Sequence, residues 1–362
     1  MRRARARSLS ACAALALALG GCASAPQALL RVDLDPAAAM RTWPGAPEVP
    51  RYRYAGQLLG EVNYASPGEN GRPAWRVALE WIAGLGEGGE RVEELLRPTA
   101  GASDGCGRIV VADPGRAAVF AFDPAGGLVV LEFAHGNSRF VAPSGLACGS
   151  DGSLLVADAA LGYVAQLDRA GTPVRRIGMG ELGRPTGLAL DRQTGELYVA
   201  DTKSHDVKVF DRDGRLVRRL GGRGEAEGEF NMPTHLWFRG GELYVTDTMN
   251  SRVQVFARGM DKPRLVVGTR GLYVGQLVRP KGVATDSAGN IYVVESYFDH
   301  LLVYDREGRF LLPIGGVGRD VGQFFLPAGV WVDDRDRIFV ADMFNGRVVV
   351  LQFLGGGADG ET

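Results

Sequence analysis

Three residues in the stretch "LYVADTKSH" (197–205) have side chains that transfer protons or bind ligands: Asp201, Lys203 and His205. A carboxylate, an amine and an imidazole this close together can act as general acid, general base or metal ligand. The pattern of this stretch, however, occurs six times in the chain. A catalytic carboxylate is not needed in every copy, so specific chemistry must be sought where the copies differ.

The acidic residue that ends each hydrophobic run recurs with a period of 43 to 48 residues. The six positions are Asp113, Asp158, Asp201, Asp247, Glu295 and Asp342. Each copy opens with a proline and a short apolar run, such as "RPTGLALD", and contains further runs separated by turns of Asp, Gly or Asn. Four short strands per copy at this period predict a β-propeller blade. Six copies therefore predict an all-β, six-bladed propeller.

The repeat resembles the NHL repeat, including the long segment between blades. That segment is seen in "GGRGEAEGEFNMP", "GTRGLYVGQLVRP" and "GGVGRDVGQFFLP". The resemblance covers about residues 75–354 and implies four-stranded blades arranged as a propeller. It implies no single activity, since NHL-type propellers serve many unrelated roles.

The last blade ends after its third strand, at "RVVVLQF" (347–353). Upstream of the first blade, residues 75–98 have the form of a fourth strand followed by an inter-blade segment. We therefore predict that residues 75–83 complete the last blade, because ring closure removes exposed sheet edges. The predicted domains are a tether with a short ordered appendage at 22–74, the propeller at 75–354, and a flexible tail at 355–362.

The N-terminus has the features of an export signal: a basic start, then an apolar run too short to span a bilayer. "LGGC", ending at Cys22, resembles the lipobox of bacterial lipoproteins and implies a signal peptide at 1–21 with lipidation of Cys22. Ala23 in place of aspartate resembles lipoproteins sent to the outer membrane. The expected location is the bacterial cell envelope, lipid-anchored in the outer membrane and facing the periplasm or the cell surface. Cleavage near "ASA", giving a soluble secreted protein, is the alternative.

Composition limits the classes of partner. A hydrophobic content of 46% with 23% charged residues excludes wholesale disorder. Loss of four arginines with the signal moves the formal charge from −1 to −5. Mild acidity without a basic cluster argues against nucleic acid. We expect a monomer without a cofactor, which has a protein, peptide or glycan partner and touches the membrane through its anchor.

Departures from the repeat predict a ligand site at one mouth of the channel. The residues after the strand-one prolines share a face with the acidic positions, and they are Thr99, Ser144, Thr186, Thr234, Lys281 and Ala328. His235 replaces a glycine present in four other blades, and Glu295 replaces aspartate in the blade of Lys281. The ligand-binding candidates are therefore His235, Lys281, Glu295, Thr234, Thr186 and Ser144. The structural alternative is a Lys281–Glu295 ion pair with His235 in the wall.

Other titratable residues have structural explanations. A carboxylate at a strand end can accept N–H groups of the following turn and fix its shape, which is the role predicted for Asp113, Asp158, Asp201, Asp247 and Asp342. His205 and His300 are expected in exposed turns. Cys106 and Cys148 fall in corresponding turns of adjacent blades, three positions out of register. A disulfide and two free thiols both stay open.

Three functions remain. The chain could be a binding or scaffolding module at a membrane, which we favour. It could instead be a metal-assisted enzyme, since peptidyl-amidoglycolate lyases, gluconolactonases and strictosidine synthases are similar propellers. His235 would then be the only well-placed ligand where zinc requires two or three, and we predict neither a catalytic residue nor a metal site. Thirdly, it could be an envelope-assembly or secretion accessory that contacts its partner through the appendage.

Overall fold

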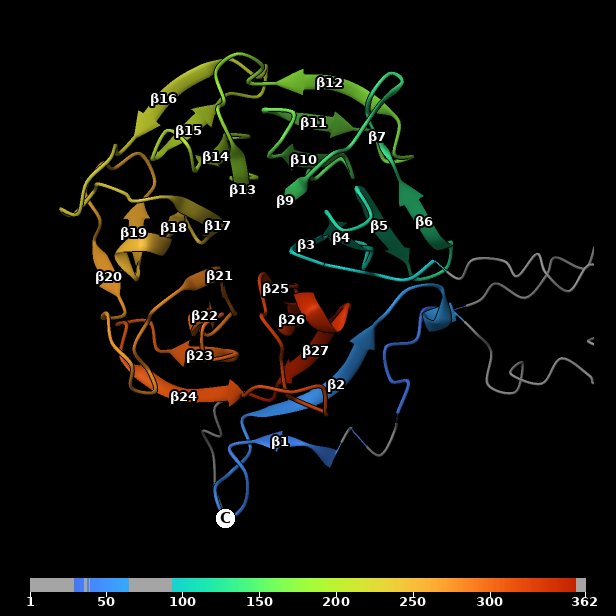
Figure 1. The fold of residues 1–362 in the computed structure, drawn as a ribbon, viewed down its shortest axis with the longest axis vertical. Coiled ribbons are helices and arrows are strands. Elements are labelled where there is room, and N and C mark those ends of the chain that lie inside the picture. The colour runs from blue at the N-terminus through green and yellow to red at the C-terminus, as the bar shows by residue number, and fades with distance from the viewer. Residues whose placement is uncertain (1–28, 36–37, 39, 65–92, 356–362) are drawn as a thin grey trace, which may run out of the picture.

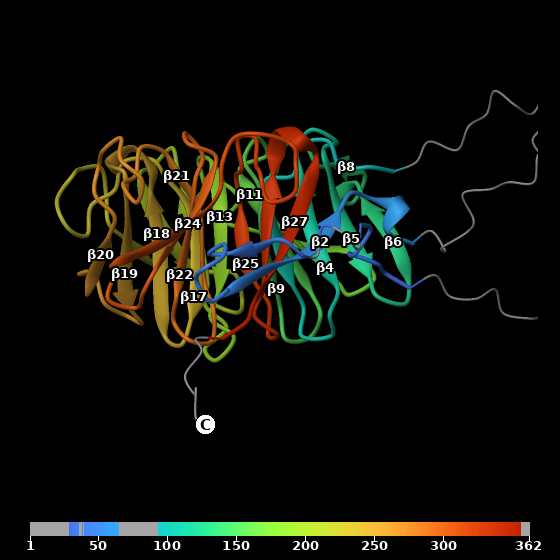
Figure 2. The same ribbon diagram turned by 90° about the horizontal axis from the view of Figure 1, so that it is seen from below.

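The computed structural model describes residues 29–35, 38, 40–64 and 93–355. Six antiparallel sheets surround a central axis as the blades of a propeller (Figure 1). Seen from the side, the blades form a short cylinder with turns at both ends (Figure 2). Within the described part of the chain, no helix is long and apolar enough to cross a bilayer. The predicted all-β, six-bladed fold is confirmed.

Blades one to three are four-stranded sheets, in which the chain runs strand by strand from the axis outward. Blade one has β3 (Ala100–Ser103), β4 (Ile109–Asp113), β5 (Ala118–Asp123) and β6 (Gly127–Leu131). Blade two has β9 (Pro143–Cys148), β10 (Leu154–Asp158), β11 (Tyr163–Leu167) and β12 (Pro173–Ile177). Blade three has β13 (Pro185–Leu190), β14 (Leu197–Asp201), β15 (Asp206–Phe210) and β16 (Leu216–Leu220). A hairpin of β7 (Phe133–His135) and β8 (Ser138–Arg139) lies between blades one and two.

Blades four and five repeat this order, and blade six is larger. Blade four has β17 (Pro233–Arg239), β18 (Glu242–Asp247), β19 (Arg252–Ala257) and β20 (Leu265–Val267), with the 3-10 turn η3 (Thr248–Asn250). Blade five has β21 (Pro280–Thr285), β22 (Ile291–Glu295), β23 (His300–Tyr304) and β24 (Phe310–Gly315). Blade six has β25 (Val330–Val332), β26 (Arg337–Asp342), β27 (Arg347–Phe353), β2 (Tyr52–Leu58) and β1 (Thr42–Trp43), with the turn η4 (Met343–Asn345).

The innermost strands pack directly on one another around the axis. A Cβ atom added to Gly145 would lie 2.1 Å from the carbonyl oxygen of Thr186 in the next blade, and one at Gly329 would lie 2.5 Å from that of Thr99. These positions require glycine because neighbouring backbone fills the space that a side chain would need. Farther out, apolar side chains of adjacent blades interdigitate to form the core.

The ring closes through a strand N-terminal to the repeats, but through a different one from that predicted. Strand β2 pairs antiparallel with β27, from Tyr52 opposite Phe353 to Leu58 opposite Val348. Residues 75–83 lie outside the described residues, and the place beside β27 assigned to them is taken by β2. That assignment is therefore wrong. An outer strand needs only a free edge and alternating burial, which β2 shows, and neither feature requires the proline and aspartate pattern of the repeat.

The segment after β2 fastens the seam between blades six and one. In the 3-10 turn η2 (Glu61–Tyr64), Asn63 is fully buried. Its side-chain hydrogen bonds all go to backbone groups, those of Arg31, Gln57, Leu59 and Gly60. The Tyr64 hydroxyl donates to the carbonyl oxygen of Asp123 in blade one at 2.9 Å. The predicted appendage is thus, where the structure describes it, part of the propeller.

Candidate functional site

The two ends of the propeller differ in what surrounds the axis. We call the end that carries the strand-one prolines and the acidic positions, such as Pro185 and Asp201, the proline face. The other end carries the turns between strands one and two, such as residues 104–108 and 191–196, and we call it the hairpin face. The predicted mouth belongs to the proline face.

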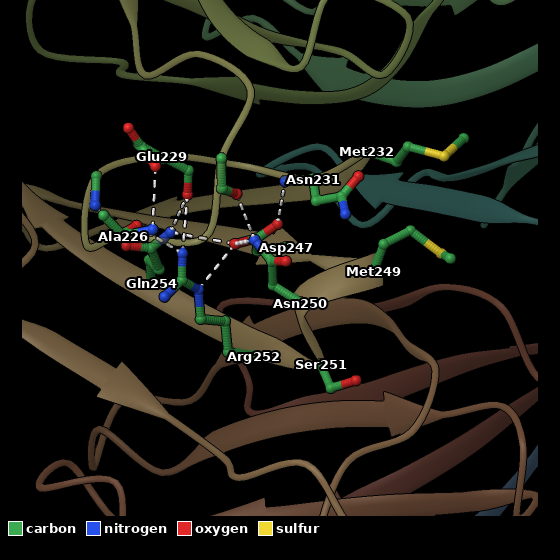
Figure 3. Close-up of polar contacts among 12 residues, drawn as sticks. Ala226, Glu229, Asn231, Met232, Asp247, Met249, Asn250, Ser251, Arg252 and Gln254 are labelled. Carbon is green, nitrogen blue, oxygen red and sulfur yellow. Dashed lines mark hydrogen bonds and ion pairs between the residues drawn. The ribbon is translucent and has the colours of Figure 1, made fainter.

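The carboxylates at the six acidic positions hold the segment that leads into each blade. Asp201 accepts the backbone N–H groups of Gly183 at 2.7 Å and Arg184 at 2.8 Å, just before the strand-one proline. Each of the other five carboxylates accepts at least one N–H group from the same two positions. In blade four, Asp247 also receives hydrogen bonds from the side chains of Asn250 and Arg252 (Figure 3). The sequence predicts bonds only to the turn that follows each carboxylate. The structure shows that the carboxylates also bind the segment that precedes the strand-one proline.

Glu295 has the same structural role as the aspartates at the other five positions. Its oxygens accept backbone N–H groups of Val278 at 2.8 Å, Arg279 at 2.9 Å and Tyr297 at 3.0 Å. Glu295 is fully buried, and among the described residues it forms no ion pair with Lys281. The longer side chain therefore substitutes for aspartate in fixing the backbone, and its oxygens are not free for a ligand at the mouth.

Hydroxyl groups of the predicted mouth connect neighbouring blades. Ser144 Oγ donates to the carbonyl oxygen of Pro185 in blade three at 3.1 Å. Thr186 Oγ1 lies 2.8 Å from Thr202 Oγ1, which donates to the carbonyl oxygen of Pro233 in blade four at 2.7 Å. Ser144 thus bonds the next blade directly and Thr186 does so through Thr202, so both contribute to assembly of the ring rather than to a free polar mouth.

His235 extends from blade four into the channel beside Lys281. Its Nδ1 lies 3.0 Å from Thr234 Oγ1, which is also 2.7 Å from Thr248 Oγ1. Burial, and secondarily the charge of Lys281, lower the pKa of His235 to about 3, although the nearby backbone of Thr99 in blade one opposes this shift. The structure thus brings together two of the predicted residues, with a neutral imidazole beside Lys281.

On the hairpin face the channel widens into a cavity of about 310 Å³ that sequence reasoning missed. His235 lies at its inner end, and the inner strands of several blades form its walls. Trp237 extends toward the neighbouring blade five, where its Nε1 donates to Thr285 Oγ1 at 3.0 Å, and its ring packs against the core between blades five and six. The signal was present in the sequence, since the equivalent residue is Ala102, Ala147, Ala189 and Ala284 in four other blades.

Charged and polar groups at the cavity rim are paired with one another. Arg258 Nε lies 2.6 Å from Asp191 Oδ2, and an Nη2 hydrogen bond of 2.8 Å joins Arg258 to Gln193. Arg192 is exposed and donates across the mouth to the carbonyl oxygen of Ser103 at 3.4 Å. Among the residues that the structure describes, no group of three or more His, Cys, Asp or Glu side chains is placed to hold a metal ion. The rim therefore consists of hydrogen-bond donors and acceptors that these pairs hold in place around an aromatic wall.

The remaining predicted histidines are less exposed than expected. His205 is half-buried, and its Nδ1 accepts the backbone N–H of Met232 at 3.1 Å. His300 is the first residue of β23 rather than a turn residue, and it is also half-buried. The predicted lipidation site, Cys22, lies outside the described residues. Neither histidine lines the channel cavity.

Cys106 and Cys148, the two cysteines within the described residues, are free thiols, so the disulfide that the sequence left open is absent. Cys148 ends strand β9 and is 3% exposed in the core between blades one and two, whereas Cys106 lies in an exposed turn. Burial raises the pKa of Cys148 to about 12. The offset of three positions between the two turns leaves the sulfur atoms in different environments.

We expect one fast and one slow thiol in the native protein. In mature chain carrying Cys22→Ser, a thiol reagent at neutral pH should modify Cys106 readily, while Cys148 should react only in denaturant, because thiolate formation and access are both suppressed there. Mass spectrometry of native and denatured samples counts the modified sites. Equal labelling of both cysteines in native protein, or no free thiol in denaturant, would contradict this assignment.

Comparison with known proteins identifies the repeat. Residues 182–210, which contain strands β13, β14 and β15 in full, match the model of the NHL repeat. The chain is 27% identical over 141 residues to Protein brain tumor of Drosophila melanogaster, covering 38% of this chain and 13% of that protein. It is 39% identical over 71 residues to NHL-repeat-containing protein 4 of Homo sapiens, covering 20% of this chain and 56% of that protein. The matches thus span well under two thirds of either relative.

Solved structures share the architecture at low sequence identity. A streptogramin B lyase superposes with a TM-score of 0.53 at 12% identity, over 72% of this chain and 83% of the lyase. A chain of a nidogen/laminin complex gives 0.52 at 18%, over 69% and 88%. An auxiliary nutrient binding protein from Bacteroides thetaiotaomicron gives 0.54 at 13%, over 71% and 69%. At such identities the likeness shows the fold alone, and the chain is therefore a six-bladed β-propeller that contains an NHL repeat in its third blade.

Proposed function

We propose that this protein is an exported binding module whose channel cavity accepts one sugar ring or one peptide side chain presented by a larger glycan or protein. The cavity of about 310 Å³ carries this proposal. Ligand pockets commonly measure about 300–1,000 Å³ and combine apolar or aromatic walls with a few polar groups. Trp237 and Phe238 supply the wall, and the rim supplies Arg192, Asp191 and Gln193.

The charges around the cavity support binding better than catalysis. A general base works best when its pKa is near the operating pH, and His235, with a pKa of about 3, is a poor proton acceptor. Asp191 and Arg258 neutralise each other at the rim. Metal-assisted chemistry would also need more ligands than the single imidazole that the described channel provides. These features favour a site that holds its ligand unchanged.

The proposed location follows from the N-terminal sequence. Lipidation at Cys22 would tether the propeller to a bacterial envelope membrane, and the described chain begins beside blade one, where the Leu30 N–H donates to the carbonyl oxygen of Pro124 at 3.2 Å. A tether attached there leaves the channel axis open. An accessory role through a separate appendage is less favoured, because β2 is a strand of blade six.

The proposal predicts a ligand that reports through tryptophan fluorescence. We would titrate the mature chain carrying Cys22→Ser with a panel of monosaccharides, disaccharides and tripeptides. A member of the panel should change the emission of the wild type, and the change should disappear in Trp237→Phe. The matched control is Trp43→Phe on the outer strand β1, which should retain it. Arg192→Ala should weaken binding by about tenfold, the effect of about 1.4 kcal/mol.

Two results would count against the channel site. Binding of every responsive probe with unchanged affinity to Trp237→Phe and Arg192→Ala would place the ligand elsewhere. Absence of any response at millimolar probe concentrations would exclude the panel classes as ligands of the cavity. Comparison of the sugar and peptide members of the panel distinguishes a glycan from a protein partner.

A further inference from the structure

The proline face carries five cations that form no ion pair with a carboxylate of the described chain. They come from blades one, three and five, and they are Arg97, Arg184, Lys203, Arg279 and Lys281. Within the described residues, none of them makes an ion pair or a side-chain hydrogen bond. The carboxylates of the six acidic positions are fully buried beneath this face and occupied by backbone N–H groups. These five cations are thus free to pair with an anion that approaches this face.

Lys281 is the central member of this group. It is half-buried at the mouth of the channel, where burial lowers its pKa and the charges of Arg279 and Arg184 lower it further. His235, which faces it, is neutral. An amine held among like charges and away from water is unfavourable unless an anion approaches. Binding of a carboxylate would relieve this repulsion.

An open depression on the surface extends the cationic region toward blades two and three. Arg184 and Lys203 line it together with His205 and Met232. The aliphatic part of Lys203 covers Gly183, where an added Cβ atom would lie 3.2 Å from Lys203 Cδ. The depression therefore combines two unpaired cations with apolar surface.

Exposed apolar side chains form an arc on the same face over blades four to six. Met249, Tyr297 and Phe344 occupy the second position after the acidic residue and are 52%, 52% and 42% exposed. Phe325 packs on Phe344 with ring centroids 5.6 Å apart. The backbone N–H of Met249 donates to the carbonyl oxygen of Asn231, which brings the neighbouring Met232 close to Met249 (Figure 3). The fold does not require large apolar groups at this position, because blades one to three have Gly115, Ala160 and Lys203 there. Such clustering marks an interaction surface.

We propose that the proline face binds an acidic amphipathic segment of a partner protein. Its carboxylates would lie on Lys281, Arg279 and the Arg184–Lys203 pair, and its apolar side chains would cover the arc of Met249, Tyr297 and Phe344. Charge complementarity selects the acidic side chains, and the arc selects a polypeptide over a bare polyanion, which would leave the apolar surface exposed. This site is separate from the channel cavity and does not depend on it.

Selection from a random peptide library displayed on phage tests the proposal without knowledge of the partner. The bait is the mature chain carrying Cys22→Ser. Selected peptides should combine Asp or Glu with aromatic or aliphatic residues, and their affinity should fall as salt rises. Lys281→Met and the double variant Tyr297→Ala, Phe344→Ala should each weaken binding at least about tenfold. Replacing Glu by Gln in the peptide should have a similar effect.

Matched controls separate this site from general charge and from the cavity. Lys262→Ala removes an exposed lysine elsewhere, and Trp237→Phe alters the cavity; both should leave peptide affinity unchanged. Lys281→Met should keep or raise the melting temperature, because it removes an unpaired charge, so a loss of binding would not reflect unfolding. Selected peptides without excess acid would overturn the proposal. So would binding of RNA or inorganic polyphosphate that depends on Lys281 but not on Tyr297 and Phe344, since the face would then recognise charge alone.

Discussion

A chain that begins at residue 65, and therefore lacks β2, should fail to form a stable propeller. Strand β2 covers the outer edge of β27 and buries Tyr52, Tyr54 and Leu58. Without it, blade six presents an unpaired, apolar edge, and the seam with blade one loses its fastening. We expect an aggregated product or one without a cooperative thermal transition by circular dichroism. The control is a chain that ends at residue 355, which should melt like the full mature protein.

A single substitution in β2 measures how much this strand contributes to stability. Tyr52 is 1% exposed and packs against Phe353 and Tyr292, with ring centroids 5.4 and 6.1 Å away. Tyr52→Ala should lower the free energy of unfolding by about 3–5 kcal/mol, as for other large buried aromatic residues. Arg53→Ala, at the exposed neighbouring position, should change it by less than about 0.5 kcal/mol. Equal midpoints in urea for the two variants would contradict closure by β2.

Replacement of Asp201 by alanine should be the most damaging change at an acidic position. Lys208 is 2% exposed, and its Nζ lies 2.5 Å from Asp201 Oδ2 and 3.1 Å from Asp206 Oδ1. Asp201→Ala removes the closer partner of this buried cation and leaves the N–H groups before Pro185 without an acceptor. Breaking such a buried pair costs about 3–5 kcal/mol. Asp213→Ala, which breaks an exposed pair with Arg215, should cost less than about 1 kcal/mol.

The contribution of Asp201 should also depend on pH. Hydrogen bonds from Gly183 N–H and Lys208 outweigh burial and lower the pKa of Asp201 to about 2, below the value of 3.8 for a free side chain. The ionised carboxylate therefore stabilises the fold above about pH 4, and this stabilisation is lost as pH falls toward 2. The difference in unfolding free energy between wild type and Asp201→Asn should shrink over that range. A difference that stays constant between about pH 4 and 2 would show that the charge is not responsible.

The repeat made the architecture predictable, because each copy carries its own strand and turn pattern. The closing strand was not predictable in the same way. The segment 52–58 shares no pattern with the repeat, while 75–83 resembles a fourth strand, so similarity pointed to the wrong segment. Only the free edge of β27 and the alternating burial of β2 decide the pairing.

The sequence predicts which residues of the candidate site are neighbours, but it does not predict what each of them does. Equivalent positions in the blades predict that His235 lies near Lys281, and the charge of Lys281 acts on the imidazole in the structure. The roles of Ser144 and Thr186 depend on how closely the next blade approaches, a distance that no sequence spacing within one blade reports. The shape of the cavity depends on the direction of the Trp237 side chain, which points toward Thr285 of blade five. Comparing the alanine position between blades would have drawn attention to Trp237 without revealing that direction.

Closure by β2 ties completion of the fold to completion of synthesis. The hydrogen bond from Arg347 to Gln57 joins residues 290 positions apart, and contacts of such high sequence separation form late and slowly. Blades one to five can be made in order as the chain emerges, but β2 has no edge to pair with until β27 has been translated. In a chain that crosses a translocation pore unfolded, the ring would therefore not close until the last strand had crossed. A premature stop before β27 would yield a protein whose ring cannot close.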